Sequence, residues 1–134
     1  MSIRATSAGG AQVEFSSCHD DEFPPSNCIS PDTSEFWMLT GMFPHEIVIR
    51  LPASATVRQV QISSMNLGSV KVSRASGPAP GSWNELCSFD MSPTPGVMQS
   101  ESADCDAGEA TFVRFQFLSG VAAFAAVYSL AVIS

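Results

Sequence analysis

Residues 111–118 read TFVRFQFL, and they give the clearest indication of the fold class. Val113, Phe115 and Phe117 have one parity, whereas Arg114 and Gln116 have the other. Successive side chains of a strand point to opposite faces of a sheet, so this alternation predicts a strand with one buried and one solvated face. A helix would instead space its apolar residues three or four positions apart.

The same alternation recurs at residues 45–51 (HEIVIRL), 57–63 (VRQVQIS) and 69–73 (SVKVS). Residues 124–134 are apolar on both faces. Their alanines would suit a helix, but their valine, isoleucine and tyrosine favour a strand. This segment is therefore predicted to be a central strand that is covered on each side.

Turn-forming residues separate these segments. Residues 76–82 (SGPAPGS), 92–96 (SPTPG) and 104–108 (DCDAG) are predicted to be loops, because proline and glycine interrupt regular structure. A series of about eight short strands between such turns is typical of a β-sandwich or barrel. The sequence thus predicts an all-β fold, either a sandwich or a barrel.

The length fits one domain, so residues 1–134 are predicted to form a single domain. The chain ends abruptly on the apolar run 130–134, which suggests that a natural C-terminal tail is absent from this sequence. No apolar run reaches the ~20 residues that span a bilayer, so direct membrane insertion is not expected. The first ten residues lack the apolar run of a secretory signal peptide.

Charge restricts the classes of partner. Six basic residues against 13 acidic ones give a net charge of −7, and the basic residues are scattered singly. Binding to a phosphate backbone needs clustered lysine and arginine, so no nucleic-acid partner is expected. Cations or a basic protein surface fit this charge better.

Four cysteines, at positions 18, 28, 87 and 105, could form two disulfides in a secreted protein. Without a signal peptide, the expectation is that they are reduced thiols. The only histidines, His19 and His45, have no further candidate metal ligand at a suitable spacing. Adjacent residues on a strand point to opposite faces, so Cys18 and His19 would not meet as nucleophile and base.

No Gly-rich phosphate loop, GxSxG elbow or HExxH motif is present in the sequence. The chain is therefore predicted to bind other molecules and not to be an enzyme.

Residues 16–44 are polar and loop-like, yet they contain several aromatic residues. A long loop of this kind is expected to dock its aromatic side chains on the core and to perform a function. Trp37 is expected to lie in the core in this way. Trp83 follows a loop, and the sequence leaves open whether it is a strand residue or an exposed anchor.

Three stretches resemble one known family: FPPSNCI (23–29), SEFWMLTGMFPHEIVI (34–49) and ATFVRFQFLSG (110–120). The family is the small discoidin-like subunit of the intraflagellar transport B complex, once classified with the small heat-shock proteins. The resemblance covers roughly residues 13 to 130, and FWxxTGMFPxE (36–46) is more specific than the general discoidin pattern. It implies an antiparallel jelly-roll β-sandwich of the galactose-binding, discoidin-like type, in which Trp37 plugs one end of the sandwich.

The resemblance also implies a function. Members of this family are non-enzymatic scaffold subunits that form a heterodimer with a Rab-like small GTPase subunit and join other intraflagellar transport B subunits. The expected location is the cilium or flagellum, with a cytoplasmic pool at the basal body.

A bound calcium ion is a further implication of the resemblance. The matching positions lie in the loop before the FW pair, and the candidate ligands are Asn27, Ser30, Asp32 and Glu35. Asn27 matches the family, whereas relatives carry Asp at the position of Ser30 and Thr at that of Glu35. Calcium takes ~6–8 oxygen ligands in flexible geometry, which such a turn can supply. The alternative is that Asp32 stabilises a local turn.

The alternative function within the same fold is a calcium-dependent lectin-like or lipid-binding discoidin module. Such modules usually present aromatic or basic residues at their loop tips. Residues 76–82 and 92–96 are mainly serine, proline and glycine, which favours the scaffold function.

Overall fold

The computed structural model describes residues 11–18, 21–29, 35–40, 42–77, 81–91, 96–120 and 124–133. Strands account for nearly all the regular structure in these ranges. Among the described residues, no helix has the length and apolar character needed to cross a membrane. The elements are β1 (Gln12–Ser16), the 3-10 helix η2 (Pro25–Ile29), β2 (Trp37–Thr40), β3 (His45–Met65), β4 (Ser69–Ala75), β5 (Asn84–Asp90), β6 (Met98–Phe117) and β7 (Phe124–Ile133).

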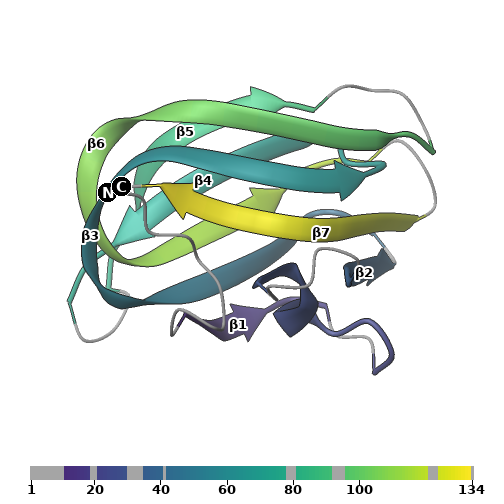
Figure 1. The fold of residues 1–134 in the computed structure, drawn as a ribbon, viewed down its shortest axis with the longest axis horizontal. Coiled ribbons are helices and arrows are strands. Elements are labelled where there is room, and N and C mark those ends of the chain that lie inside the picture. Colours follow the sequence, from purple (N-terminus) through teal and green to yellow (C-terminus); the bar gives the residue numbers. More distant parts are fainter. Residues whose placement is uncertain are drawn as a thin grey trace.

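Two long strands organise the sandwich. β3 has 21 residues and β6 has 20, and the two pair antiparallel along most of their length. Figure 1 shows that they bend together at one end, so that each contributes to both layers. One layer contains β2, β7, the second half of β3 and the first half of β6. The other contains β1, the first half of β3, the second half of β6, β4 and β5.

The prediction of an all-β antiparallel jelly-roll sandwich is confirmed. Every strand pairing is antiparallel, and the hydrogen-bonded order is β2-β7-β3-β6-β4-β5, with β1 on β3. The seven labelled strands, two of which serve both layers, agree with the expectation of about eight short strands.

Two details of the sequence prediction are wrong. Residues 45–51 and 57–63 were expected to be separate strands, but both belong to β3. Residues 104–108 were expected to be a loop, but they lie inside β6, where Gly108 pairs with Val57. The β3–β6 register shifts between Arg50 and Ala55 and again between Val57 and Gln59. Such bulges bend a strand sharply without ending it, so the turn-forming residues make a corner between the two layers.

The core lies between the layers. Val113, Phe115 and Phe117, the predicted inward face of residues 111–118, are fully buried. β7 is hydrogen-bonded to β2 on one side and β3 on the other, and most of its residues are buried, which confirms the prediction of a covered central strand.

Trp37 closes the core at β2, as predicted. Its side chain is 0% exposed, and its ring meets the ring of Phe117 edge to face at a centroid distance of 6.1 Å. The indole Nε1 donates a hydrogen bond of 3.0 Å to the carbonyl oxygen of Cys18. This bond satisfies the polar atom of an otherwise apolar buried side chain.

The aromatic residues of the 16–44 segment dock on the sheet, again as predicted. The rings of Phe23 and Phe36 stack at a centroid distance of 4.5 Å, and Phe36 contacts Tyr128 of β7 at 5.0 Å. The backbone nitrogen of Met38 donates to the carbonyl oxygen of Phe23, at 3.1 Å. The segment around η2 is therefore attached to the β2–β7 side of the sandwich.

Candidate functional site

The predicted calcium ligands lie around η2 and the start of β2. The backbone nitrogen of Asn27 donates to Pro24 O at 3.0 Å, and its side-chain Nδ2 donates to Phe36 O at 2.9 Å. This bond holds Asn27 at the backbone of Phe36, the residue after the exposed Glu35. Ser30 and Asp32 lie outside the described residues.

The pair that is described offers suitable chemistry for calcium. The Asn27 amide uses its nitrogen to fix the turn, and its oxygen is the atom that would bind a cation. Glu35 would supply a carboxylate, which calcium prefers. No group of three or more His, Cys, Asp or Glu side chains at metal-binding spacing occurs among the described residues. A calcium site here therefore also needs the oxygens of Ser30, Asp32 or backbone carbonyls.

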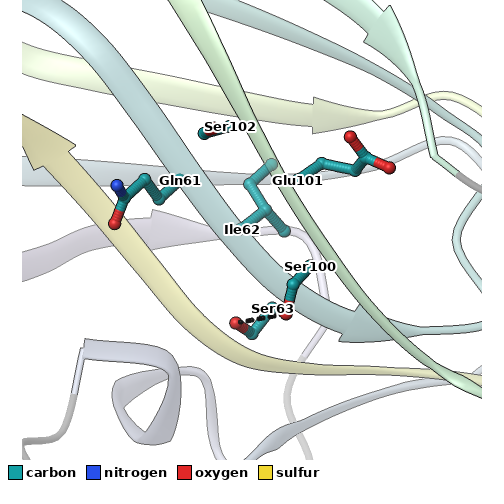
Figure 2. Close-up of a pocket in the computed structure, with 6 residues that line it drawn as sticks. All are labelled: Gln61, Ile62, Ser63, Ser100, Glu101 and Ser102. Carbon is teal, nitrogen blue, oxygen red and sulfur yellow. Dashed lines mark hydrogen bonds between the residues drawn. The ribbon is translucent and has the colours of Figure 1, made fainter.

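The outer face of one layer is polar. A shallow hollow between β3 and β6 is lined by Gln61, Ile62, Ser63, Ser100, Glu101 and Ser102 (Figure 2). The hydroxyls of Ser63 and Ser100 lie 3.5 Å apart across the two strands. The lining contains no aromatic ring on which a sugar or a peptide side chain would stack.

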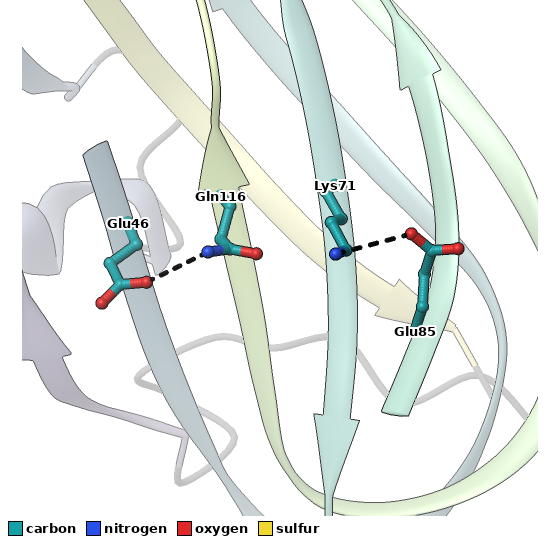
Figure 3. A network of polar contacts seen from close by, with 4 residues as sticks. All are labelled: Glu46, Lys71, Glu85 and Gln116. Carbon is teal, nitrogen blue, oxygen red and sulfur yellow. Dashed lines mark hydrogen bonds and ion pairs between the residues drawn. The ribbon is translucent and has the colours of Figure 1, made fainter. Parts of the chain in front are cut away.

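The outer face of the other layer carries polar and charged side chains in contacting pairs. Figure 3 shows Gln116 Nε2 donating to Glu46 Oε2 at 3.4 Å, and Lys71 Nζ lying 3.8 Å from Glu85 Oε1. The charged partners of the Lys71–Glu85 pair are solvent-exposed, so the pair contributes little stability.

Trp83 also lies on this outer face. The Arg114 guanidinium carbon sits 4.6 Å from the centre of its ring, and the ring packs against a small cluster of Val48, Ala75 and Phe112. Trp83 precedes β5 and is half-buried, so it covers the sheet and is not a freely exposed anchor.

His45, at the start of β3, is buried. Its ring meets Phe43 edge to face at 5.0 Å, and desolvation by burial lowers the pKa of the imidazole, opposed by a backbone hydrogen bond with Thr40. His45 is therefore neutral at neutral pH and acts as a packing residue.

Apolar exposure concentrates at one end of the sandwich, which we call the loop end. It lies opposite the bend of β3 and β6 (Figure 1). It comprises the residues in or next to the β2–β3, β3–β4, β5–β6 and β6–β7 connections. Met42 is 91% exposed and Phe124 is 44% exposed. Of the six large hydrophobic residues exposed within the described part of the chain, five belong to this end: Met42, Val97, Met98, Leu118 and Phe124.

Two buried amides hold the loop end together. Asn66 adopts the left-handed conformation (φ 66°), which asparagine tolerates better than most residues. Its Nδ2 donates to Phe124 O at 3.1 Å, and its Oδ1 accepts from Gly96 N at 2.8 Å. Asn66 thus connects the start of β7 and the approach to β6 with the end of β3.

Gln99 makes the second set of bonds. Its Oε1 accepts from Ser64 Oγ at 3.0 Å and from Leu67 N at 3.1 Å, and its Nε2 donates to Leu67 O at 2.9 Å. The backbone next to the exposed side chains of Val97, Met98 and Phe124 is therefore fixed by hydrogen bonds. Several exposed large apolar residues gathered at one end of a domain are typical of a protein-binding site.

Sequence reasoning missed this site. Met42, Val97 and Phe124 are apolar residues next to loops, where polar residues are usual, and this was the available signal. The positions of Val97 and Phe124 depend on Asn66 and Gln99, two buried polar residues that strand alternation does not identify.

The architecture places the protein in the jelly-roll class that includes the family 32 carbohydrate-binding modules. The module of C. perfringens NanJ, solved with galactose, matches with a TM-score of 0.82 over 100% of both chains at 12% sequence identity. A module from Clostridium perfringens solved with GalNAc-β-1,3-galactose matches equally well, over 98% of this chain and 100% of the other at 12% identity. Such low identities establish the fold and no more.

Sequence similarity is more particular. The chain is similar to the Homo sapiens intraflagellar transport protein 25 homolog, with 29% identity over 124 residues, which is 92% of this chain and 86% of that protein. It is also 28% identical over 133 residues to intraflagellar transport protein 25 of Chlamydomonas reinhardtii, covering 99% of this chain and 70% of that protein. No protein-family model matches the sequence. The resemblance to the small discoidin-like intraflagellar transport subunit is thus confirmed along almost the whole chain.

Proposed function

We propose that the protein is a non-enzymatic subunit of the intraflagellar transport B complex and works as an adaptor in the cilium or flagellum. The main support is the similarity to intraflagellar transport protein 25 from an animal and an alga, over 92% and 99% of the chain. These names point to a transport subunit and not to an enzyme. A cytoplasmic pool at the basal body is part of the same proposal.

The proposed direct partner is a Rab-like small GTPase subunit, which would form a heterodimer with this chain. We assign the loop end as the docking surface, because the two outer faces of the sandwich carry polar or paired charged residues where they are described above. Apolar side chains on a fixed base lose little conformational entropy on binding, which favours a tight complex. Other subunits of the complex would then contact the remaining surface.

The docking proposal predicts a selective loss of affinity. The wild-type chain and the GTPase subunit should elute together as a one-to-one complex in size-exclusion chromatography at micromolar concentration. Replacing Phe124 with glutamate places a charge in the apolar patch and should weaken binding at least about tenfold in titration calorimetry, as expected for an interface hot spot.

Phe15 provides the matched control, because it is 51% exposed and lies on β1, which pairs with β3 at a distance from the loop end. Phe15→Glu should bind as the wild type does. Equal weakening by both substitutions would show that the loop end is not the docking surface. Separate elution of the wild-type proteins would contradict the heterodimer itself.

We also propose a structural calcium ion in the loop that contains Asn27, Ser30, Asp32 and Glu35. The support is the family resemblance, together with the bond that holds the Asn27 amide at the backbone of Phe36, the residue after Glu35. When bound, calcium would draw oxygen ligands toward one centre and stabilise the loop against the β2–β7 side of the sandwich.

Calcium is therefore expected to raise the melting temperature of the protein, and EDTA should reverse the rise. A ligand that binds only the folded state stabilises it by mass action, and calcium at 100 times its dissociation constant would add about 2.7 kcal/mol. The double variant Asp32→Asn, Glu35→Gln should show no rise. The control variant Asp21→Asn, Glu22→Gln changes an exposed acidic pair before η2 and should respond as the wild type does. No shift in the wild type at millimolar calcium would leave Asp32 and Glu35 as turn residues.

The alternative is a lectin-like or lipid-binding module, and the likeness to sugar-binding structures is the observation that favours it. The polar hollow of Figure 2 is the described site that a polyhydroxyl ligand would fit, although it offers hydroxyls and amides without an aromatic ring. Saturable, calcium-dependent binding on a glycan array would favour this alternative over the adaptor function.

A further inference from the structure

Cys87 and Cys105 face each other across an open margin of the sandwich. Their Sγ atoms lie 3.5 Å apart, although the two residues are 18 positions apart in sequence. Cys87 is on β5, the last strand in the hydrogen-bonded order, and Cys105 is on β6 just before the corner. Both side chains are half-buried, so small molecules can reach this margin.

No strand ladder bridges this margin in the part of the chain that the structure describes. β5 pairs with β4, and the first half of β6 pairs with β3 on its other side. The two strands belong to different layers, and the cysteines meet where the edges of those layers approach. A disulfide between the two cysteines would therefore link the edge of one layer, at β5, covalently to the edge of the other layer, at β6.

We propose that Cys87 and Cys105 are a redox modification site, which a low-molecular-weight disulfide such as glutathione disulfide converts into an intramolecular disulfide. A disulfide needs its sulfur atoms at about 2.05 Å and its Cβ atoms at about 3.5–4.5 Å. The present sulfur separation requires a closure of the order of 1.5 Å, which side-chain torsions and small strand shifts can provide. The other two cysteines differ in surroundings, since Cys28 is buried and Cys18 lies beside the carbonyls of β2.

The chemistry is thiol–disulfide exchange in two steps. The thiolate of Cys105 attacks one sulfur of glutathione disulfide, forms a mixed disulfide and releases one glutathione thiolate. Cys87 then loses its proton to solvent, and its sulfur attacks Cys105 Sγ and releases the second glutathione. Two protein thiols lose two electrons, and one glutathione disulfide is reduced to two glutathione molecules.

The order of the steps follows from the environment of Cys87. The hydrogen bond with Cys105 raises the pKa of the Cys87 thiol well above its usual range, and burial and the charge of Glu85 act in the same direction. Cys87 therefore keeps its proton longer and is the less favoured first nucleophile of the two. The hydrogen bond is lost once Cys105 carries glutathione, which frees Cys87 for the second attack.

Oxidation is expected to stabilise the protein. The disulfide would close a loop containing the connection from β5 to β6, and restricting this loop in the unfolded chain should raise the melting temperature by about 10 °C. The closed loop includes Val97 and Met98, so oxidation would also restrain one side of the loop end.

The test uses the full chain, reduced and then incubated with millimolar glutathione disulfide. Two of the four thiols should remain titratable afterwards, and peptide mapping without reductant should join the segments that contain Cys87 and Cys105. Cys87→Ser should instead accumulate a glutathione adduct on Cys105, without the rise in melting temperature. The control Cys18→Ser should form the same disulfide as the wild type.

Four titratable thiols in the treated wild type, or a disulfide that joins a different pair, would overturn the proposal. A melt of each reduced variant shows whether it is folded. If Cys87→Ser does not fold, Cys105→Ser gives the same information, since it must also lack the intramolecular bond.

Discussion

Replacing Trp37 with alanine is expected to lower the free energy of unfolding by about 4 kcal/mol, measured by urea denaturation. The indole is 0% exposed, contacts Phe117 and donates to the backbone of Cys18 at the other end of the 16–44 segment. The substitution leaves a large cavity between β2 and the core, and also leaves the Cys18 carbonyl without this donor. Both effects destabilise the folded state.

The second tryptophan supplies the matched control. Trp83 is half-buried on an outer face, with Arg114 above it. Trp83→Ala removes a residue of the same size without opening the main core, so its cost should be less than half that of Trp37→Ala. Equal losses for the two variants would contradict the assignment of Trp37 as the residue that closes the sandwich.

Gln99→Leu is expected to cost roughly 3 kcal/mol or more, because it removes a buried amide and leaves its partners unsatisfied. Leu67 would lose partners for both its backbone nitrogen and oxygen, and Ser64 would lose the acceptor of its hydroxyl. Leucine has a similar volume, so the loss would report the hydrogen bonds more than a cavity. Urea denaturation measures the change directly.

Gln61→Leu is the matched control, because it makes the same glutamine-to-leucine replacement at a surface position. Gln61 is on the polar outer face of β3, and its amide makes a long 3.4 Å bond with Gln59. Substitutions at such surface positions usually change stability by about 0.5 kcal/mol or less. If Gln99→Leu had an effect as small as this, the amide would not be holding the loop end together.

The architecture could be predicted from the sequence because one physical signal dominates it. A strand that buries one face alternates apolar and polar residues, so the core positions Val113, Phe115 and Phe117 could be predicted without any tertiary information. Trp37 was identified differently, as a large aromatic residue inside a polar loop and by the resemblance to discoidin-like domains. The jelly-roll type was then narrowed by the resemblance of residues 36–46, which the sequence relatives confirm.

Local composition failed where a long-range constraint overrides it. Residues 104–108 are good turn formers, yet they continue β6, because the bent ladder with β3 uses them to make the corner. The paired thiols of Cys87 and Cys105 were equally invisible to sequence reasoning. Their approach depends on the edges of two layers meeting, and sequence spacing carries no trace of that.

The candidate sites include residues that the sequence predicts and residues that only the tertiary structure brings together. Asn27 and Glu35 were chosen by resemblance, and the structure shows Asn27 bonded to the backbone of Phe36, the residue after Glu35. The loop end, in contrast, is assembled from four connections that are far apart in the chain. Asn66 and Gln99 tie three of these connections to each other, at residues 66–67, 96–99 and 124.

The central claim is membership of an intraflagellar transport assembly through a partner held at the loop end. The most direct measurement is purification of the tagged wild-type chain from ciliated cells, beside Phe124→Glu and Phe15→Glu, with quantitative identification of the bound proteins. The account predicts that a Rab-like GTPase and other intraflagellar transport B subunits co-purify in stoichiometric amounts with the wild type and Phe15→Glu. It also predicts that the GTPase is strongly depleted from Phe124→Glu. Purification of the wild type without any intraflagellar transport subunit would contradict the account.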